Sequence, residues 1–211
     1  MKLYQESVWK YSGPANGESG RGLANVLITE ITKLENLRSI CDLGCGNGYL
    51  TGRLASLGYD VVGVDASQSG LDIASQTHPR SRFILEYIDA QLVSKTGLQK
   101  VDLVVASDII EHLYRPADLL EAASSLLDNG GHLILTTPYH GYLKNVVLSI
   151  LNKMDSHFTA LVDGGHIKFF SVKTLSDIVK RYGFEDLRFS FYGRAPWLWK
   201  NMICHARRVA A

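Results

Sequence analysis

Three glycines at alternate positions, Gly44, Gly46 and Gly48, follow a short apolar segment and directly precede a helical pattern. Because glycine has no Cβ, a turn built from these residues brings bare backbone up against a ligand. The helix that follows offers N–H groups without intrahelical partners and the positive end of its dipole. The residues therefore predict a site for a nucleoside-type cofactor at the carboxyl end of the first strand.

The spacing of the glycines distinguishes between cofactors. The dinucleotide fingerprint Gly-x-Gly-x-x-Gly requires glycine at position 49 or 51, and these positions hold Tyr49 and Thr51. This disfavours a nicotinamide-dependent oxidoreductase. The string Asp-Leu-Gly-Cys-Gly-Asn-Gly (42–48) instead resembles motif I of the class I S-adenosylmethionine-dependent methyltransferases. The alternative is an ordinary strand–turn–helix that uses glycine only for tightness.

A second string, Ala-Ser-Asp-Ile-Ile-Glu-His-Leu (106–113), resembles the Glu-His segment of the ubiquinone-biosynthesis O-methyltransferases and related small-molecule enzymes. The resemblance covers residues 40–137 by sequence and the tail by topology. It implies an α/β fold with a Rossmann-like, doubly wound, seven-stranded sheet, mostly parallel with the last strand antiparallel. It also implies S-adenosyl-L-methionine as the cofactor and transfer of its methyl group to a small molecule, at an oxygen.

The same resemblance assigns cofactor contacts. Asp65 ends the second strand, and a carboxylate near this spacing accepts hydrogen bonds from ribose hydroxyls. Its alternative role is to cap the helix that begins near Ser67. Asp89 matches the acid that accepts from the adenine amino group, and a surface carboxylate is its alternative. The complete expected set is Asp42, Gly44, Gly46, Gly48, Asp65, Ala66, Asp89, Ala90 and Ser107.

Three histidines are candidates for the base that takes the acceptor proton: His112, His140 and His166. The ordinary pKa of histidine lies near working pH, which suits general-base catalysis. For His112 the alternative is structural, an imidazole that bridges its loop to a neighbouring backbone. Asp108 and Glu111, with His112 and His166, are also ligand types for a divalent metal. We assign no metal ligand from sequence, and keep a metal-assisted methyltransferase as an alternative.

Hydrophobic periodicity places these residues on alternating elements. It predicts strands at 40–43, 60–64, 82–88, 101–106 and 132–136, and helices at 23–37, 49–57, 68–76 and from Pro116 onward. Asn129-Gly130-Gly131 is expected to stop the helix before the fifth strand. Such alternation favours a parallel sheet covered on both faces.

We expect a single domain, 1–211. It divides into an N-terminal segment and helix (1–38), a cofactor-binding core (39–137), an insertion (138–170), and a closing helix and strand hairpin (171–211). An amphipathic helix at 142–154 is expected to act as a lid over the acceptor, or else to pack on the sheet or pair with another subunit. Trp9 and Tyr11 are expected to wall the cofactor site or to cover apolar surface.

The composition narrows the class of protein. The chain has 211 residues, 46% of them hydrophobic, and 22 basic against 21 acidic residues give a net charge of +1. This balance predicts no nucleic-acid partner. Three cysteines without a Cys-x-x-Cys pair favour a reducing compartment, and no stretch reaches membrane-spanning length, so a cytoplasmic protein is expected. Oligomeric state is not predicted. A catalytically silent cofactor-binding protein of the same fold is the alternative function.

Overall fold

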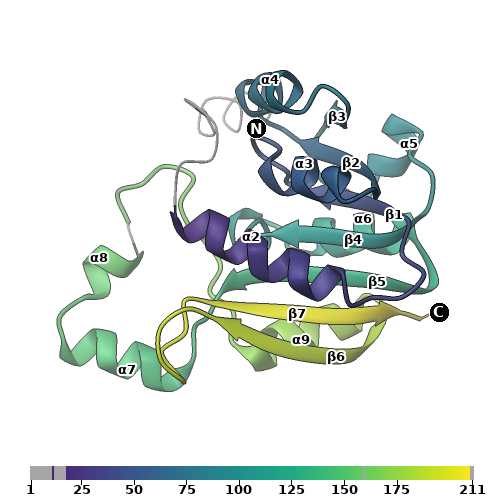
Figure 1. The fold of residues 1–211 in the computed structure, drawn as a ribbon. Helices are drawn as coiled ribbons and strands as arrows, with labels where there is room; N and C mark the ends of the chain where they lie inside the picture. The colour runs from purple at the N-terminus through teal and green to yellow at the C-terminus, as the bar shows by residue number, and fades with distance from the viewer. Residues whose placement is uncertain (1–10, 12–17, 159, 210–211) are drawn as a thin grey trace.

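The computed structural model describes Tyr11, residues 18–158 and residues 160–209. Trp9 lies outside the described residues. The strands, coloured in chain order in Figure 1, are β1 (Ser39–Leu43), β2 (Asp60–Asp65), β3 (Arg82–Leu85), β4 (Val101–Ser107), β5 (Leu127–Pro138), β6 (Phe184–Tyr192) and β7 (Asn201–Arg208). The described helices are α2 (Glu18–Ile31), α3 (Tyr49–Ser56), α4 (Gln68–Thr77), α5 (Leu92–Thr96), the 3-10 helix η1 (Ile110–His112), α6 (Ala117–Leu126), α7 (Tyr142–Ile150), α8 (Met154–Phe158) and α9 (Val172–Arg181).

The strands form one sheet in the order β3-β2-β1-β4-β5-β7-β6. The first five strands pair in parallel, and β7 runs antiparallel between β5 and β6. This confirms the predicted fold class. The chain passes from β1 outward to β3 and then returns to place β4 on the other side of β1. Such a reversal opens a crevice beyond the carboxyl ends of β1 and β4, where doubly wound sheets bind ligands.

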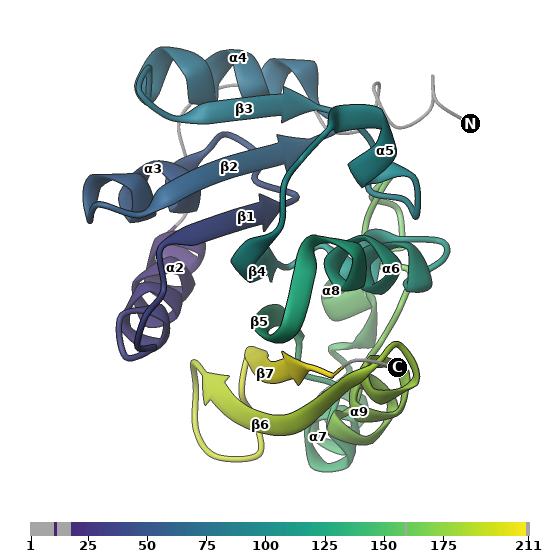
Figure 2. The same cartoon turned by 90° about the vertical axis from the view of Figure 1, so that its right-hand side faces the viewer.

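Helices cover both faces of the sheet. Figure 2 shows α2 and α3 on one side and α5, α6 and α9 on the other. Successive side chains of a strand point to opposite faces, so Leu103 and Val105 of β4 pack with the α2 and α3 side while Val104 and Ala106 pack with the α6 and α9 side. Because both faces are buried there, the central strands β2 and β4 are nearly continuous apolar runs.

Several element boundaries differ from the sequence prediction. β3 ends at Leu85 rather than 88, and the short helix α5 was not predicted. The prediction that 129–131 ends the preceding helix is wrong, because α6 already ends at Leu126 and β5 runs through these residues. The predicted helix 23–37 is displaced toward the N-terminus: α2 ends at Ile31, and Asn36 takes a left-handed φ of 60° before β1.

The insertion differs most from expectation. The helix expected at 142–154 ends at Ile150, because Asn152 adopts a left-handed φ of 51°, and the separate helix α8 begins at Met154. Figure 1 shows both helices beyond the carboxyl ends of β4 and β5, apart from the face of the sheet. Much of the α7 apolar surface is exposed, with Ile150 at 76%. Among the described residues, no helix is both long enough and apolar enough to cross a membrane.

A pair of histidines connects β5 and β7, which run antiparallel to each other. Nδ1 of His132 on β5 lies 2.8 Å from Nε2 of His205 on β7, and the rings are stacked. Burial lowers the pKa of both side chains, that of His205 to about 4. Arg207 lowers both further, and Arg188 lowers that of His205.

Two carboxylates face the pair from other elements and oppose this shift: Asp102 near His132 and Glu30 near His205. In the unfolded chain both histidines recover a pKa near 6.5, so below that pH the unfolded state binds more protons than the folded state. Stability from the neutral pair is therefore complete above about pH 6.5 and is lost as pH falls toward 4.

We expect His205→Gln to reduce the acid sensitivity of the fold. The loss of unfolding free energy between pH 7 and pH 5 should be smaller in this variant than in the wild type by about 1 kcal/mol, after allowance for partial solvent exposure. Urea denaturation at the two pH values measures this difference. Equal losses in both proteins would show that the pair does not titrate on unfolding.

Candidate functional site

The glycine turn joins β1 to α3 at the switch point of the sheet. Gly44, Gly46 and Gly48 have φ values of 79°, 55° and 77°, a backbone region that side-chain-bearing residues rarely adopt. The N–H groups of Gly44 and Cys45 donate to the carbonyl of Val64, at 2.8 and 3.1 Å, so the turn is fastened to the end of β2. The loop therefore presents fixed backbone next to the second strand.

Gly48 combines a left-handed backbone with a packed surrounding that leaves no room for a side chain. A Cβ built there would lie 2.7 Å from the Cβ of Ala74 and 2.9 Å from Phe83. We expect Gly48→Ala to lower the free energy of unfolding by about 2 kcal/mol or more, since left-handed strain and a clash add. Chemical denaturation measures the loss. Gly97→Ala is the matched control, because Gly97 also has a positive φ of 66° but its Cβ would meet nothing within 4 Å. Equal losses in the two variants would contradict the clash.

Asp42 lies beneath the turn rather than facing open space. Its side chain is 1% exposed, and its Oδ2 accepts from the hydroxyl of Thr51 on α3 at 2.6 Å. Burial raises the pKa of Asp42 to about 7, and the Thr51 hydrogen bond partly offsets this shift. In this arrangement the carboxylate ties the strand before the turn to the helix after it.

Asp65, at the end of β2, holds the turn from the other side. Its Oδ2 accepts from the N–H of Gly46 at 2.8 Å and its Oδ1 from the N–H of Ser67 at 2.7 Å. Ser67 itself caps α4, since its hydroxyl accepts from Gly70. Burial raises the pKa of Asp65, and the backbone hydrogen bonds oppose the shift. A carboxylate has about four acceptor positions, so two bonds leave capacity for ligand hydroxyls.

A cavity of about 500 Å³ opens beside this carboxylate. Six of the residues expected from sequence line it: Gly44, Asp65, Ala66, Asp89, Ser107 and His112. Tyr11 lines it too, as one of the two roles predicted for it requires, and its N–H donates to Ser69 Oγ at 3.1 Å. Asp42, Gly46, Gly48, Ala90, His140 and His166 are outside the lining set. The first three of these shape the turn, while the exposed Ala90 follows the lining residue Asp89.

Asp89 lines the cavity, and two neighbouring groups hold its carboxylate. One carboxylate oxygen accepts from the N–H of Gln91 at 2.8 Å, and the other pairs with the ammonium of Lys95. Both side chains of the ion pair are about one-third exposed, at 33% for Asp89 and 32% for Lys95. The carboxylate is therefore held in place at the mouth, and Lys95 is a lining residue that sequence reasoning missed.

His112 reaches the cavity from η1. Its Nδ1 lies 3.0 Å from the carbonyl of Gly164 and 3.3 Å from that of Gly165. Because carbonyl oxygens only accept, Nδ1 carries the proton and the lone pair resides on Nε2. Burial lowers the pKa of His112, which keeps the ring neutral. The structural bridge to a neighbouring backbone is thus present, and the tautomer that it selects is the one a base or a metal ligand needs.

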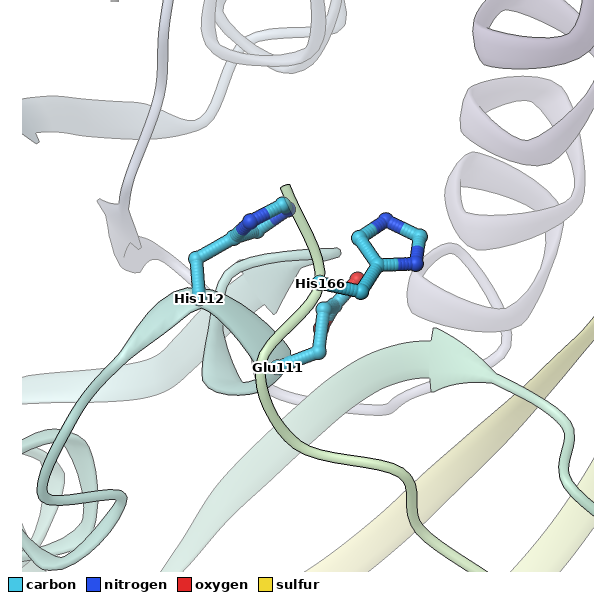
Figure 3. Close-up of side chains that lie close together, drawn as sticks. All are labelled: Glu111, His112 and His166. Atoms are coloured by element: carbon cyan, nitrogen blue, oxygen red, sulfur yellow. The ribbon is translucent and has the colours of Figure 1, made fainter. Parts of the chain in front are cut away.

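Glu111, beside His112, is a fully buried acid whose raised pKa Thr137 partly offsets. It is 0% exposed, and neither carboxylate oxygen has a hydrogen-bond partner among the described residues. Burial and the nearby charge of Asp108 raise its pKa well above the ordinary value. Ligand atoms of Glu111, His112 and His166 all lie within 4.8 Å of one another. In Figure 3 the Glu111 side chain points toward the His166 ring, and His112 comes from the same short helix.

Asp108 is a lining residue absent from the expected cofactor set. It adopts a left-handed φ of 51°, which is uncommon outside glycine, and strain of this kind clusters at functional sites. Its Oδ1 accepts from the Thr136 hydroxyl at 2.7 Å and from the Asn201 amide at 2.8 Å. Burial raises its pKa. The position was visible in the sequence as a metal-ligand type, but its hydrogen bonds depend on β5 and β7.

His140 lies apart from this cavity, in the insertion. Its ring is 5.5 Å from that of His157, 5.7 Å from Phe158 and 5.0 Å from Phe169, centroid to centroid. Burial, then the charge of Lys144, lowers the pKa of His140 to about 4. The three candidate histidines are therefore divided between two places: His112 and His166 meet, with ring centroids 4.8 Å apart, and His140 belongs to an aromatic cluster.

The fold and the site together define a doubly wound α/β protein with a glycine-turn cofactor site at the switch point of its sheet. Residues 19–188 match the family model of the methyltransferase domain, and the chain belongs to this family, whose cofactor is S-adenosylmethionine. It is 29% identical over 167 residues to the ubiquinone biosynthesis O-methyltransferase of Roseobacter denitrificans, covering 76% of this chain and 66% of that protein. The chain thus spans about two thirds of the length of such curated relatives.

Solved structures share the fold at lower identity. Magnesium protoporphyrin IX methyltransferase from Synechocystis PCC 6803, with bound S-adenosylhomocysteine, has a TM-score of 0.70 at 20% identity and covers 98% of this chain and 99% of its own. The N-methyltransferase NodS from Bradyrhizobium japonicum WM9 has a TM-score of 0.68 at 15% identity, with 99% of each chain covered. Since the fold serves different acceptor atoms, it does not by itself identify the acceptor.

Proposed function

We propose that the protein transfers the methyl group of S-adenosylmethionine to an oxygen of a small-molecule acceptor. The observation that carries this proposal is the position of His112, whose unprotonated Nε2 belongs to a ring lining the same cavity as Asp65 and the glycine turn. Relatives named as O-methyltransferases of ubiquinone biosynthesis support oxygen as the acceptor atom. We do not extend their acceptor to this chain.

In this proposal the cofactor is held along the carboxyl ends of β1, β2 and β4. Asp65 accepts from the ribose hydroxyls and Asp89 from the adenine amino group, while Gly44 and Ser107 pack against the methionyl part. Ala66 and Ala90 lie next to the two acids, and Asp42, Gly46 and Gly48 maintain the turn. Insertion 138–170 selects the acceptor, and the buried, unpaired thiols fit a cytoplasmic location.

The chemistry needs little from the protein beyond position and a base. S-adenosylmethionine, when bound, supplies a methyl group already activated by its sulfonium. The cavity walls exclude water and hold the acceptor in line with that methyl group. His112 Nε2 would take the proton that the acceptor hydroxyl loses when its oxygen is methylated. His166 and His140 are the other candidates for this proton transfer, and His166 stands next to His112.

The experiment that tests the proposal is incubation of the full chain with methyl-labelled S-adenosylmethionine and a panel of phenols, catechols and hydroxy acids. Formation of a labelled methyl ether with the protein, and not in a control without protein, supports the proposal. Saturable cofactor binding without methylation of any acceptor favours the catalytically silent alternative. Label on nitrogen or carbon contradicts the choice of atom.

A second candidate function is metal-assisted methyl transfer, favoured by the cluster Glu111, His112 and His166. A buried carboxylate without a hydrogen-bond partner is costly, and a divalent cation would offset that cost. One carboxylate and two imidazoles suit a transition metal. The metal would draw the acceptor hydroxyl close and lower its pKa, and His112 would then act as a ligand rather than as a base.

We expect removal of metal to separate the two candidates. Under metal assistance, dialysis against a chelator abolishes turnover, added Mn²⁺ or Zn²⁺ restores it, and Glu111→Gln weakens titrated binding of the ion by at least about tenfold. Under base catalysis alone, the chelated enzyme keeps its activity. Glu121→Gln is the control. Glu121 is a partly exposed acid of α6 that pairs with Arg115, and its substitution should leave ion binding unchanged.

A further inference from the structure

Four basic side chains gather in the insertion and the loop beside it. His140 precedes α7, Lys144 lies on α7, His157 on α8, and Arg194 in the loop between β6 and β7. Lys144 is near enough to lower the pKa of His140 and His157, and Arg194 to lower that of Lys144. None of the four forms an ion pair with a described carboxylate. Lys144 and Arg194 are therefore two neighbouring cations without a carboxylate partner among the described residues, and the imidazoles beside them stay neutral.

Lys144 is the most costly member of this group. It is 2% exposed, and its Nζ donates to the carbonyl of Tyr139 at 2.7 Å. An ammonium carries three donors, and a buried one without an anionic partner costs several kcal/mol. The acids of the insertion, Asp155 and Asp163, are exposed and pair with none of the four basic groups. Among the described residues, this buried cation thus has no anionic partner.

Polar atoms around Lys144 also lack partners. His140 is 8% exposed, and its Nδ1 has no hydrogen-bond partner among the described residues, although Asn145 is near. Nε2 of His157 and Oδ1 of Asn145 are also buried without a hydrogen-bond partner among the described residues. Buried polar groups in native proteins are nearly always satisfied, by protein, by water or by a ligand. His140 and Asn145 are near enough for Asn145 to raise the pKa of His140, so Nε2 of His157 is the atom beside the buried ammonium that has no such neighbour among the described residues. This atom and the ammonium indicate a ligand-binding place.

An aromatic wall adjoins these polar groups. Phe158 stacks on His140 at 5.7 Å between centroids, and Phe169 meets Phe158 edge-on at 4.9 Å. Phe169 remains 45% exposed, so the wall is accessible. A ligand that satisfies both parts has a flat apolar body and an anionic end.

The charge distribution places this region on the acceptor side. His166 connects the two, because its ring lies 4.8 Å from that of His112 and the charges of His157 and Lys144 lower its pKa. In the cavity the bases Lys95 and Arg115 are paired with the acids Asp89 and Asp118. Lys144 and Arg194 beside the insertion have no carboxylate partner among the described residues, so an anionic group is attracted to this region.

We propose that Lys144, Arg194, His140 and His157 form a subsite for a carboxylate or phosphate of the methyl acceptor, with Phe158 and Phe169 against its apolar body. This inference rests on the proposed function, since it names the chemical class of the acceptor. The acceptor is then an amphiphilic anion whose hydroxyl points toward His112.

The test is calorimetric titration of the full chain with benzoate, with inorganic phosphate and with benzamide, the neutral analogue of benzoate. We expect saturable binding of at least one anion and at least tenfold weaker binding of benzamide. Lys144→Met should weaken anion binding about tenfold, equivalent to about 1.4 kcal/mol. Arg194→Gln, at an exposed position that does not endanger folding, should weaken it about threefold. Lys153→Met, an exposed lysine between α7 and α8, should change nothing.

The two anions distinguish the sources of the charge: tighter benzoate binding indicates an aromatic carboxylate, and tighter phosphate binding indicates a phosphate ester. Equal affinity for benzoate and benzamide, binding of neither anion, or anion affinity unchanged in both Lys144→Met and Arg194→Gln would overturn the subsite. Titration of the same preparations with S-adenosylmethionine keeps this failure separate. Intact cofactor binding and methylation of a neutral acceptor would leave the proposed function standing.

Discussion

His112→Asn should reduce the turnover number at least about 100-fold, because the candidate base that lines the cavity is removed. Asparagine carries an amide N–H close to where histidine carries Nδ1, so the hydrogen bonds to the carbonyls of Gly164 and Gly165 can persist. The loop over η1 should therefore stay in place. The dissociation constant for S-adenosylmethionine should change less than about threefold, since the ring bounds the cavity without serving the cofactor.

The measurement pairs kinetics with calorimetry, using the acceptor that the labelled-methyl screen identifies. His78→Asn is the control, because His78 ends α4 and is absent from the residues that line the cavity. Added imidazole should restore part of the activity of His112→Asn if the lost group is a base. A variant with near wild-type turnover would remove His112 from the chemistry and transfer the role to His166 or His140.

Asp65→Ala should weaken S-adenosylmethionine binding about 100-fold, the largest effect that we expect on affinity. Hydrogen bonds to a charged acceptor contribute about 1.5–3 kcal/mol each, and the ribose offers two hydroxyls. The same substitution also leaves the N–H groups of Gly46 and Ser67 without their acceptor. We expect a loss of about 1–3 kcal/mol in unfolding free energy. Because of these two bonds, Asp65→Ala is expected to change the stability of the fold as well as the affinity for the cofactor.

Two further variants separate affinity from stability in that experiment. Asp65→Asn keeps one acceptor oxygen and should retain more stability while still losing affinity. Asp72→Ala removes an exposed carboxylate of α4 and should leave both quantities near wild type. If Asp65→Ala binds S-adenosylmethionine as tightly as the wild type, Asp65 serves only the turn.

The core of the fold was predictable because the local sequence patterns of its strands and turns agree with the way these elements pack in the sheet. Buried strands such as β1 and β4 are continuous apolar runs, and each is followed by a turn with a recognisable residue type. The insertion was not predictable to the same degree, because the expected helix ends early, before Asn152, and a second short helix follows it. α5 is only five residues long, too short for a periodic pattern to register.

The site, like the fold, has a part that the sequence predicts and a part that it does not. Gly44 and Asp65 meet across β1 and β2, as their positions at strand ends predict. The pairing of Asp89 with Lys95 and the convergence of Glu111, His112 and His166 depend on loop paths that no short-range pattern encodes. The sequence shows Lys144 only as a lysine within a mainly apolar helix. Its burial follows from tertiary packing, which the sequence pattern does not reveal.

The central claim is that the glycine turn and Asp65 form an S-adenosylmethionine site, and calorimetric titration of the purified full chain tests it most directly. S-adenosylmethionine and S-adenosylhomocysteine are titrated in parallel, with NAD as the control. The account predicts saturable binding of the first two and none of NAD. Absence of binding to either sulfur compound, or binding of NAD in their place, would contradict it.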